Sequence, residues 1–401
     1  MNIDCAIING NIITPSRIIE RGCVLITDGK IVDVLNNTPT LAEGVNIIDA
    51  KGNFVSPGFI DLHTHGAGGA DLMDGSVEAF LTVARMHATH GTTLLYPTTL
   101  TSSNQVLFDT FDIYHDAQKR NINGAQLGGL HLEGPYFSPE QGGAQDKSHL
   151  RTPKPEEYME ILNRTDSIAR WSLAPELPGS EEFIKVLCER GILVAAAHTN
   201  ATFEEMQQAY EHGMTHLTHF YSCMSTVTRR NAYRYAGVLE FGYYEDNVTI
   251  EIIADGIHVP SSLLKLVTKI KGPERIALIT DSMRAAGMPE GKSILGSLTE
   301  GQEVIVEDGV AKLLDRSAFA GSVATADRLV RTVIREGNVT LFDAVRMMTE
   351  TPAHIMHADH HKGSIKKGMD ADLIIFDNNI NIQRTIINGT TIYTNYTKKS
   401  C

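Results

Sequence analysis

Five side chains in the middle of this chain have the types and positions to bind a metal ion together. His63 and His65 end the apolar run "GFIDLHT", and because side chains along a strand alternate between its faces, both imidazoles project from the same face. Three other apolar runs end in Glu133, His198 and His219. Imidazole nitrogens and a carboxylate together suit a borderline divalent ion such as zinc or iron. These five residues are therefore predicted metal ligands.

One further carboxylate, Asp281 at the end of "RIALITD", is left for proton transfer. A bound metal lowers the pKa of water from about 16 to about 7. A nearby carboxylate can accept that proton and return it to a leaving group. A single strand-end histidine is as easily explained by hydrogen bonding in a core, but six such residues together favour a metal-dependent hydrolase.

The runs that carry these residues alternate with helical stretches. The segment Ser76–His90 begins with a serine cap and stops before a glycine, and a second helix begins at Asn200 or Thr202 and ends at Gly213. About eight such βα units over roughly 300 residues predict an α/β fold, with a (β/α)8 TIM-like barrel over residues 56–358 and chemistry at the carboxyl ends of its strands. A doubly wound sheet is the alternative, but no GxGxxG motif follows the first strand of the block.

The two ends of the chain share a different pattern of short strands and tight turns. Apolar runs are interrupted at Asn9-Gly10, Asp28-Gly29 and Asn388-Gly389, the dipeptides favoured in type I′ hairpin turns. Neither end has enough apolar surface for a stable sheet of its own. We therefore expect one small β-sandwich domain assembled from residues 1–55 and 359–401.

The overall composition narrows the class of protein. The 401 residues are 42% hydrophobic and 21% charged, as in globular proteins, and the net charge of −13 argues against nucleic acid as a partner. No apolar run approaches the roughly 20 residues that cross a bilayer, and the N-terminus lacks the features of a secretory signal. We expect a cytoplasmic protein without membrane contact, whose cysteines are free thiols: Cys5, Cys23, Cys188, Cys223 and Cys401.

The remaining histidines are expected to be structural or solvent-exposed. His216 has the opposite strand parity to His219, so its side chain should face the helices and serve the structure. Cys223 has no histidine in a general-base pattern beside it and is not expected to be a nucleophile. Surface positions are expected for the histidines on helical stretches and for the group near "TPAHIMHADHHKG": His87, His90, His115, His212, His354, His357, His360 and His361.

The ordered strand-end set resembles the amidohydrolase superfamily. Longer motifs, including "GLHLEGPYFSPEQGGAQ", "IADGIHVP", "ITDSMRAAGMPEG" and "FAGSVATADRLVR", are similar to those of the N-acetylglucosamine-6-phosphate deacetylase family, and the similarity runs from about Leu25 to Asp377. The resemblance implies hydrolysis of the N-acetyl group of N-acetylglucosamine 6-phosphate in amino-sugar catabolism. No nucleic acid or membrane partner is implied.

Roles for the strand-end residues follow from this resemblance. Glu133, His198 and His219 would hold the metal shared by the family, whereas His63 and His65 match the members that can hold a second one. The chain would thus bind one or two divalent ions, with zinc expected first and iron or manganese as alternatives. Asp281 would be the catalytic acid and base.

The resemblance also implies a substrate-binding set. Arg230 would reach the phosphate in the adjacent subunit, which implies a homodimer, and His258 would contact the amino-sugar phosphate. The full set is Ala144, Gln145, Ser222, Cys223, Arg230, His258, Phe319, Ala320 and Gly321.

Three departures from the family pattern fall on the sugar or phosphate side. Ser222-Cys223 replaces the usual Asn-Ala, Gln145 stands where many members have a histidine, and "RRNAYRYAG" replaces "GREPG" around Arg230. Two alternatives therefore stay open: a deacetylase or deaminase relative that acts on another N-acetyl hexosamine phosphate or on an unphosphorylated substrate, and a non-catalytic barrel that serves as a scaffold.

Overall fold

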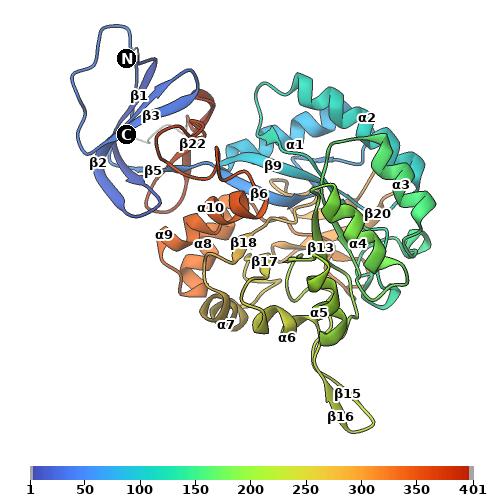
Figure 1. Ribbon diagram of the computed structural model, residues 1–401. Coiled ribbons are helices and arrows are strands. Elements are labelled where there is room, and N and C mark those ends of the chain that lie inside the picture. The colour runs from blue at the N-terminus through green and yellow to red at the C-terminus, as the bar shows by residue number, and fades with distance from the viewer. Residues whose placement is uncertain (1–2, 397–401) are drawn as a thin grey trace.

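The short apolar runs in the middle of the chain form parallel strands that close into a barrel, seen at the lower right of Figure 1. The structure is a computed structural model and describes residues 3–396. The barrel closes where Asp281 N donates to His63 O at 2.8 Å and Thr64 bridges Ser282. The (β/α)8 fold expected from the sequence is confirmed. Its strands are β6 (Phe59–Thr64), β9 (Thr92–Thr99), β10 (Gln126–Leu127) continued by β11 (Leu130–Glu133), β12 (Ile168–Leu173), β13 (Leu193–Ala196), β14 (His216–Leu217), β17 (Thr249–Ile252) and β18 (Ile276–Leu278).

Helices follow the barrel strands and cover their outer face (Figure 1). In α1 the cap is Ser76, whose side chain accepts from Ala79 N, and in α5 it is Thr202, which forms a capping box with Glu205. Both helices were expected from the sequence. The helices are α1 (Val77–Thr89), α2 (Asn104–Arg120), α3 (Pro155–Arg164), α4 (Ser180–Glu189), α5 (Phe203–Glu211), α6 (Val238–Tyr244), α7 (Ser261–Lys271), α8 (Ala326–Gly337), α9 (Leu341–Arg346) and α10 (Glu350–Ile355).

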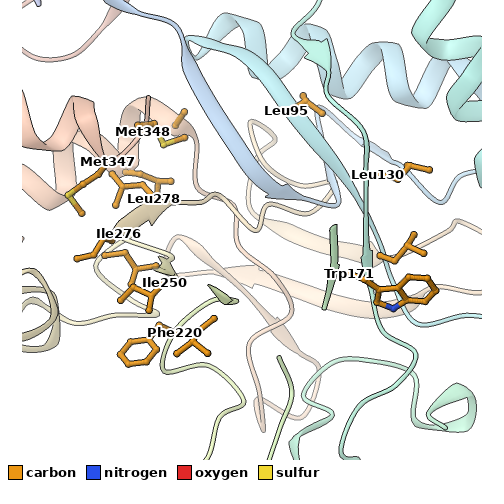
Figure 2. Close-up of a cluster of buried hydrophobic side chains, with 14 of the residues drawn as sticks. Leu95, Leu130, Trp171, Phe220, Ile250, Ile276, Leu278, Met347 and Met348 are labelled. Carbon is orange, nitrogen blue, oxygen red and sulfur yellow. The ribbon is translucent and has the colours of Figure 1, made fainter. Parts of the chain in front are cut away.

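Apolar side chains fill the layer between strands and helices. Figure 2 shows Trp171, Phe220 and Ile250 among the fully buried residues of this core. Trp171 and Ile250 lie on strands β12 and β17, and the residues next to them in these strands, Arg170 and Glu251, are buried and charged. Apolar packing thus holds the strands and helices together. A second apolar cluster lies among the barrel strands beside the buried charges and includes Ile60, Leu94 and Ile279.

Several short elements lie in the segments that follow the barrel strands. Along the chain, a three-stranded sheet comes between β18 and α8. A hairpin after β14 projects away from the barrel (Figure 1). These elements are β7 (Gly66–Ala67), β8 (Ala70–Asp71), the 3-10 helices η1 (Pro139–Gln141) and η2 (Lys147–His149), the hairpin β15 (Thr228–Arg230) and β16 (Tyr233–Tyr235), and the sheet β19 (Gly291–Leu295), β20 (Gln302–Glu307) and β21 (Val310–Leu313).

Both ends of the chain build one further sheet beside the barrel (Figure 1). Strand β5 pairs with β1 from the N-terminal part and with β22 from the C-terminal part, so neither end forms the sheet alone. The division at residues 55 and 359 remains a prediction. The strands are β1 (Cys5–Ile13), β2 (Ile18–Thr27), β3 (Lys30–Leu35), β4 (Asn46–Asp49), β5 (Phe54–Pro57), β22 (Leu373–Phe376), β23 (Ile382–Ile387) and β24 (Thr390–Thr394).

Two of the three predicted hairpin turns are present in this sheet. Asp28-Gly29 and Asn388-Gly389 have positive φ at both residues and join paired strands. The turn predicted at Asn9-Gly10 is wrong, because these residues form a bulge inside β1. Asn9 Nδ2 donates to Asp49 at 3.0 Å, and a Cβ at Gly10 would lie 2.4 Å from a methyl of Val55. Cross-strand packing therefore overrides the local turn signal.

The surface position expected for His87 is also wrong. It is only 3% exposed, and its Nε2 lies 3.0 Å from Thr64 Oγ1 and 3.3 Å from Ser282 Oγ, where the barrel closes. His87 lies on the buried side of α1 with Val83 and Ala84. Burial lowers its pKa to about 3, so the imidazole is neutral.

Within residues 3–396, no helix is both long enough and apolar enough to span a membrane. Four of the cysteines are free: Cys5, Cys23, Cys188 and Cys223. The fifth, Cys401, lies outside the described residues.

Candidate active site

The strand-end residues converge at the carboxyl end of the barrel. Glu133, at the end of β11, is common to two groups of metal-ligand type: one with His63 and His65, the other with His198 and His219. His63 Nε2 lies 3.5 Å and His65 Nε2 3.4 Å from oxygens of Glu133. On the other side, His198 Nε2 and His219 Nε2 lie 3.4 Å and 3.0 Å from Glu133 Oε1. All five side chains are buried.

The outer ring nitrogens of three of these histidines are held by acceptors. His65 Nδ1 donates to Thr98 O at 3.2 Å, and His198 Nδ1 donates to Gln141 O at 2.8 Å. His63 Nδ1 donates to a carboxylate oxygen of Glu251 at 3.4 Å. Each of these bonds places a proton on Nδ1 and leaves the lone pair of Nε2 directed at Glu133.

This arrangement fits a divalent cation. For His63, His65 and His198, imidazole lone pairs and carboxylate oxygens face one another at 3.4–3.5 Å, which is unfavourable unless a positive charge lies between them. Burial lowers the pKa values of His63 and His65, but Asp281 and Glu133 outweigh burial and raise them to about 9 and about 10. The cluster therefore attracts positive charge, and a metal ion can supply it in place of these protons.

Three of the converging residues have unusual backbone conformations. His198, His219 and Asp281 have φ values of 46°, 30° and 46°, in the left-handed region that residues other than glycine seldom adopt. Each such residue costs about 1–3 kcal/mol, and such residues cluster at functional sites. The backbone strain thus coincides with the predicted site.

Asp281 stands at the mouth of the cluster. Its Oδ1 lies 3.2 Å from His65 Nε2 and 3.4 Å from His63 Nε2. Burial raises its pKa, but the neighbouring histidines outweigh burial and hold the pKa below its ordinary value. The carboxylate also lines the cavity described below. Asp281 is thus ionised, in reach of the cluster, and open to a substrate.

A buried ion pair inside the barrel contacts the histidines of the cluster and orients them. Glu251 and Arg170 are fully buried and bonded to each other. Glu251 Oε2 accepts from both His63 Nδ1 and the backbone N–H of His219, at 3.4 Å and 3.3 Å. Burial by itself raises the pKa of Glu251, but Arg170, His216 and His63 hold it well below its ordinary value. One carboxylate therefore orients residues of both candidate metal groups.

His216 lies beside this ion pair and not against the helices, so its predicted orientation is wrong. Its Nε2 is 3.2 Å from Glu251 Oε1, inside the barrel. Strand β14 contains only His216–Leu217, and the chain bends before His219, so strand alternation does not continue between the two histidines. The structural role expected for His216 agrees with its contacts.

A cavity of about 280 Å³ opens above the cluster. Most residues predicted to bind substrate line it, and Ala320 is fully buried behind its wall, with its N–H donated to Ala311 O. Arg230, exposed on β15, is not among the described residues that line this cavity. The predicted residues at the wall are His65, Glu133, Ala144, Gln145, His198, His219, Ser222, Cys223, His258, Asp281, Phe319 and Gly321.

Gln145 and His258, which both line this cavity, are held in fixed orientations by hydrogen bonds. Gln145 Nε2 donates to Glu133 Oε2 at 2.7 Å, and its Oε1 accepts from Thr101 N at 2.9 Å. An amide nitrogen carries two protons, so one N–H of Gln145 remains for a substrate oxygen. His258 Nδ1 donates to Asp255 at 2.8 Å, and its ring packs 4.5 Å from that of Phe319.

Sequence reasoning missed two sets of residues at the site. The Arg170–Glu251 pair left a signal, because each is a single charge inside an apolar strand, in "IARWSL" and "TIEI". The other set lines the cavity from loops and from the end of the short strand β19, outside the barrel strands that the sequence predicted: Leu100, Gly143, Tyr221, Leu295 and Ala318.

The paired histidines of β6 lead to a prediction about metal content. Replacing His63 and His65 together with Asn should lower the metal content by about one ion per chain, because the second group keeps its own ligands. Elemental analysis of purified protein measures this, and circular dichroism checks the fold. The matched control replaces the exposed His354 and His357 with Asn. Equal metal content in both variants would contradict the assignment.

The sequence and fold match those of characterised proteins. The profile of the amidohydrolase family matches residues 54–392. The chain therefore belongs to the amidohydrolase family, as the strand-end pattern indicated.

Within this family, its relatives include N-acetylglucosamine-6-phosphate deacetylases and an N-acetylgalactosamine-6-phosphate deacetylase from Escherichia coli O157:H7, which is 30% identical over 86% of this chain. The N-acetylglucosamine-6-phosphate deacetylase from Lysinibacillus sphaericus is 34% identical over 95% of this chain and 96% of its own length. The one from Bacillus subtilis is 32% identical over 94% of each chain. The crystal structure of N-acetylglucosamine-6-phosphate deacetylase from Pasteurella multocida superposes with a TM-score of 0.90, at 30% identity, over 97% of this chain and 99% of that one.

Proposed function

We propose that this chain hydrolyses the N-acetyl group of N-acetylglucosamine 6-phosphate to glucosamine 6-phosphate and acetate. The observation that carries the proposal is the buried set of Glu133, four histidines and Asp281 below one cavity, in a chain whose full-length relatives are named for this activity. Such a set serves hydrolysis of an amide and has no use in a scaffold protein.

In the proposed reaction, Asp281 carries the proton. It accepts a proton from the attacking water as the water oxygen bonds to the amide carbon. It then donates this proton to the sugar nitrogen as the carbon–nitrogen bond breaks, which releases acetate and the free amine. Gln145 donates one N–H to Glu133, and its second N–H would donate to the carbonyl oxygen, where negative charge develops.

The two groups around Glu133 would hold one or two divalent ions, and we propose zinc, with iron or manganese as alternatives. When bound, such an ion supplies Lewis acidity, which activates water and polarises the carbonyl. Glu251 and Thr98 keep the Nε2 atoms of His63 and His65 directed at it.

The assay that tests the function is acetate release from a panel of N-acetylhexosamine 6-phosphates. The glucosamine derivative should be hydrolysed with the highest kcat/KM, and the galactosamine and mannosamine derivatives serve as comparisons. The unphosphorylated sugar is the fourth substrate. If it were hydrolysed as efficiently as the phosphorylated one, the deaminase or unphosphorylated-substrate alternative would gain support.

We further propose a cytoplasmic homodimer in which Arg230 reaches the neighbouring active site. The free thiols favour a reducing compartment. Arg230 lies on the projecting β15–β16 hairpin (Figure 1), its guanidinium 5.4 Å from the ring centroid of Tyr235. An exposed arginine on an arm remote from its own cavity suits contact with the phosphate of a substrate bound by a partner.

Replacing Arg230 with Ala should raise KM for the sugar phosphate roughly 10- to 100-fold with a smaller change in kcat, because a charge-assisted phosphate contact is lost. Steady-state kinetics measures both constants. Arg234→Ala on the facing strand of the hairpin is the matched control. An unchanged KM in the Arg230 variant, or an equal rise in both, would count against this role.

A further inference from the structure

A second cavity lies directly behind one wall of the candidate active site. It measures about 320 Å³ and shares four wall residues with the first cavity: Leu100, Ala144, Gln145 and Leu295. These residues therefore form a partition between the two spaces. None of the roles assigned above uses the second cavity.

The partition is thin. A Cβ at Gly296, which lines the second cavity, would lie 3.3 Å from Leu100 Cδ1, so the tip of Leu100 rests against that backbone. Gln145 is fixed at both ends of its amide, to Glu133 and to Thr101 N. The side chains of Leu100 and Leu295 have no such polar anchor. Replacing either leucine with a smaller residue would therefore join the active-site cavity and the second cavity.

Three of the four partition residues, Leu100, Ala144 and Leu295, are apolar. Leu295 belongs to a buried apolar cluster, against which Leu100 and Ala144 pack. The residues that line the same cavity outside the partition include polar and aromatic groups such as Ser222 and His258. In an N-acetylated sugar phosphate the methyl group is the apolar end. Burying this methyl group against apolar side chains stabilises the complex through the hydrophobic effect. The acyl end of the substrate therefore fits the partition.

We propose that Leu100 and Leu295 set the length of the acyl group that this enzyme removes, and that the second cavity can hold the end of a longer acyl chain once the partition is opened. The inference rests on the proposed function. It concerns the acyl end alone, so it holds for any N-acetyl hexosamine phosphate that the enzyme accepts.

The test compares kcat/KM for N-acetyl-, N-propionyl- and N-butyrylglucosamine 6-phosphate by release of the amine. In the unmodified enzyme kcat/KM should fall steeply with chain length. In Leu100→Ala the ratio of butyryl to acetyl should rise about tenfold, the effect of burying two more methylenes. Leu295→Ala should act in the same direction and serves if the first variant does not fold.

Val106→Ala is the matched control, because Val106 lines the second cavity but lies outside the partition. Its acyl preference should equal that of the unmodified enzyme. The inference is overturned if both leucine variants are folded and active yet keep the original preference, or if the unmodified enzyme already removes butyryl as well as acetyl groups. An unmodified enzyme that releases no acetate would instead overturn the proposed function, and this inference with it.

Discussion

Asp281→Asn should lower kcat about 10³-fold, because the amide can neither accept the proton of the attacking water nor return it to the departing amine. The change conserves shape, and the backbone bonds of residue 281 to His63 and Ser322 remain available. Acetate release measures kcat, while elemental analysis and circular dichroism should show that metal content and fold are retained.

A control variant distinguishes loss of kcat through a disturbed structure from loss of kcat through a missing proton acceptor. Asp327→Asn is a suitable control, since Asp327 is also a buried aspartate bonded to a histidine, His90, but lies on α8 away from the cavity. It should leave kcat unchanged. Near-normal turnover in the Asp281 variant would show that Asp281 does not transfer the proton.

Arg170→Met should lower the free energy of unfolding by roughly 3–5 kcal/mol, because it leaves the carboxylate of Glu251 buried without its partner. Arg170 also donates to Leu62 O and to Thr218 Oγ1, so three bonds at the base of the site are lost. Chemical denaturation measures the stability, and metal content should fall because Glu251 orients His63.

The double variant Arg170→Met with Glu251→Leu distinguishes an unpaired charge from a lost packing contact. Removing both charges should recover much of the stability, since an apolar pair of similar volume can replace a buried ion pair. Metal content should nevertheless be low in the double variant, because His63 Nδ1 loses its acceptor when Glu251 is replaced. Equal stability of the single variant and the unmodified chain would show that the pair does not support the fold.

Local patterns predicted the barrel and the helices because those patterns coincide with what the tertiary structure needs. Ser76 and Thr202 cap helices whose apolar faces pack on the barrel, and Asp28-Gly29 joins strands that pair anyway. The hairpin turn predicted at Asn9-Gly10 was wrong, because the same dipeptide can also form a bulge when the chain continues along a neighbouring strand. Pairing with the surrounding strands, and not the dipeptide itself, therefore determines whether a turn or a bulge forms.

The candidate site was predictable to the extent that it depends on strand ends. In a parallel barrel the carboxyl ends of all strands meet on one face, so polar residues that end apolar runs are brought together without knowledge of any contact. His87 and His216 were misplaced because their surroundings come from distant segments: Ser282 for His87 and Glu251 for His216.

The sequence by itself determined the barrel class, the candidate metal ligands around Glu133 and the candidate acid and base Asp281, because these follow from periodicity and from the chemistry of each side chain. Only the tertiary structure decided which nitrogen of each histidine faces the cluster, that Arg170 and Glu251 pair beneath it, and that Leu100 and Leu295 separate two cavities. Arg170 and Glu251 stand 81 residues apart and Leu100 and Leu295 still further, and contacts across such separations depend on closure of the barrel, which no local pattern encodes.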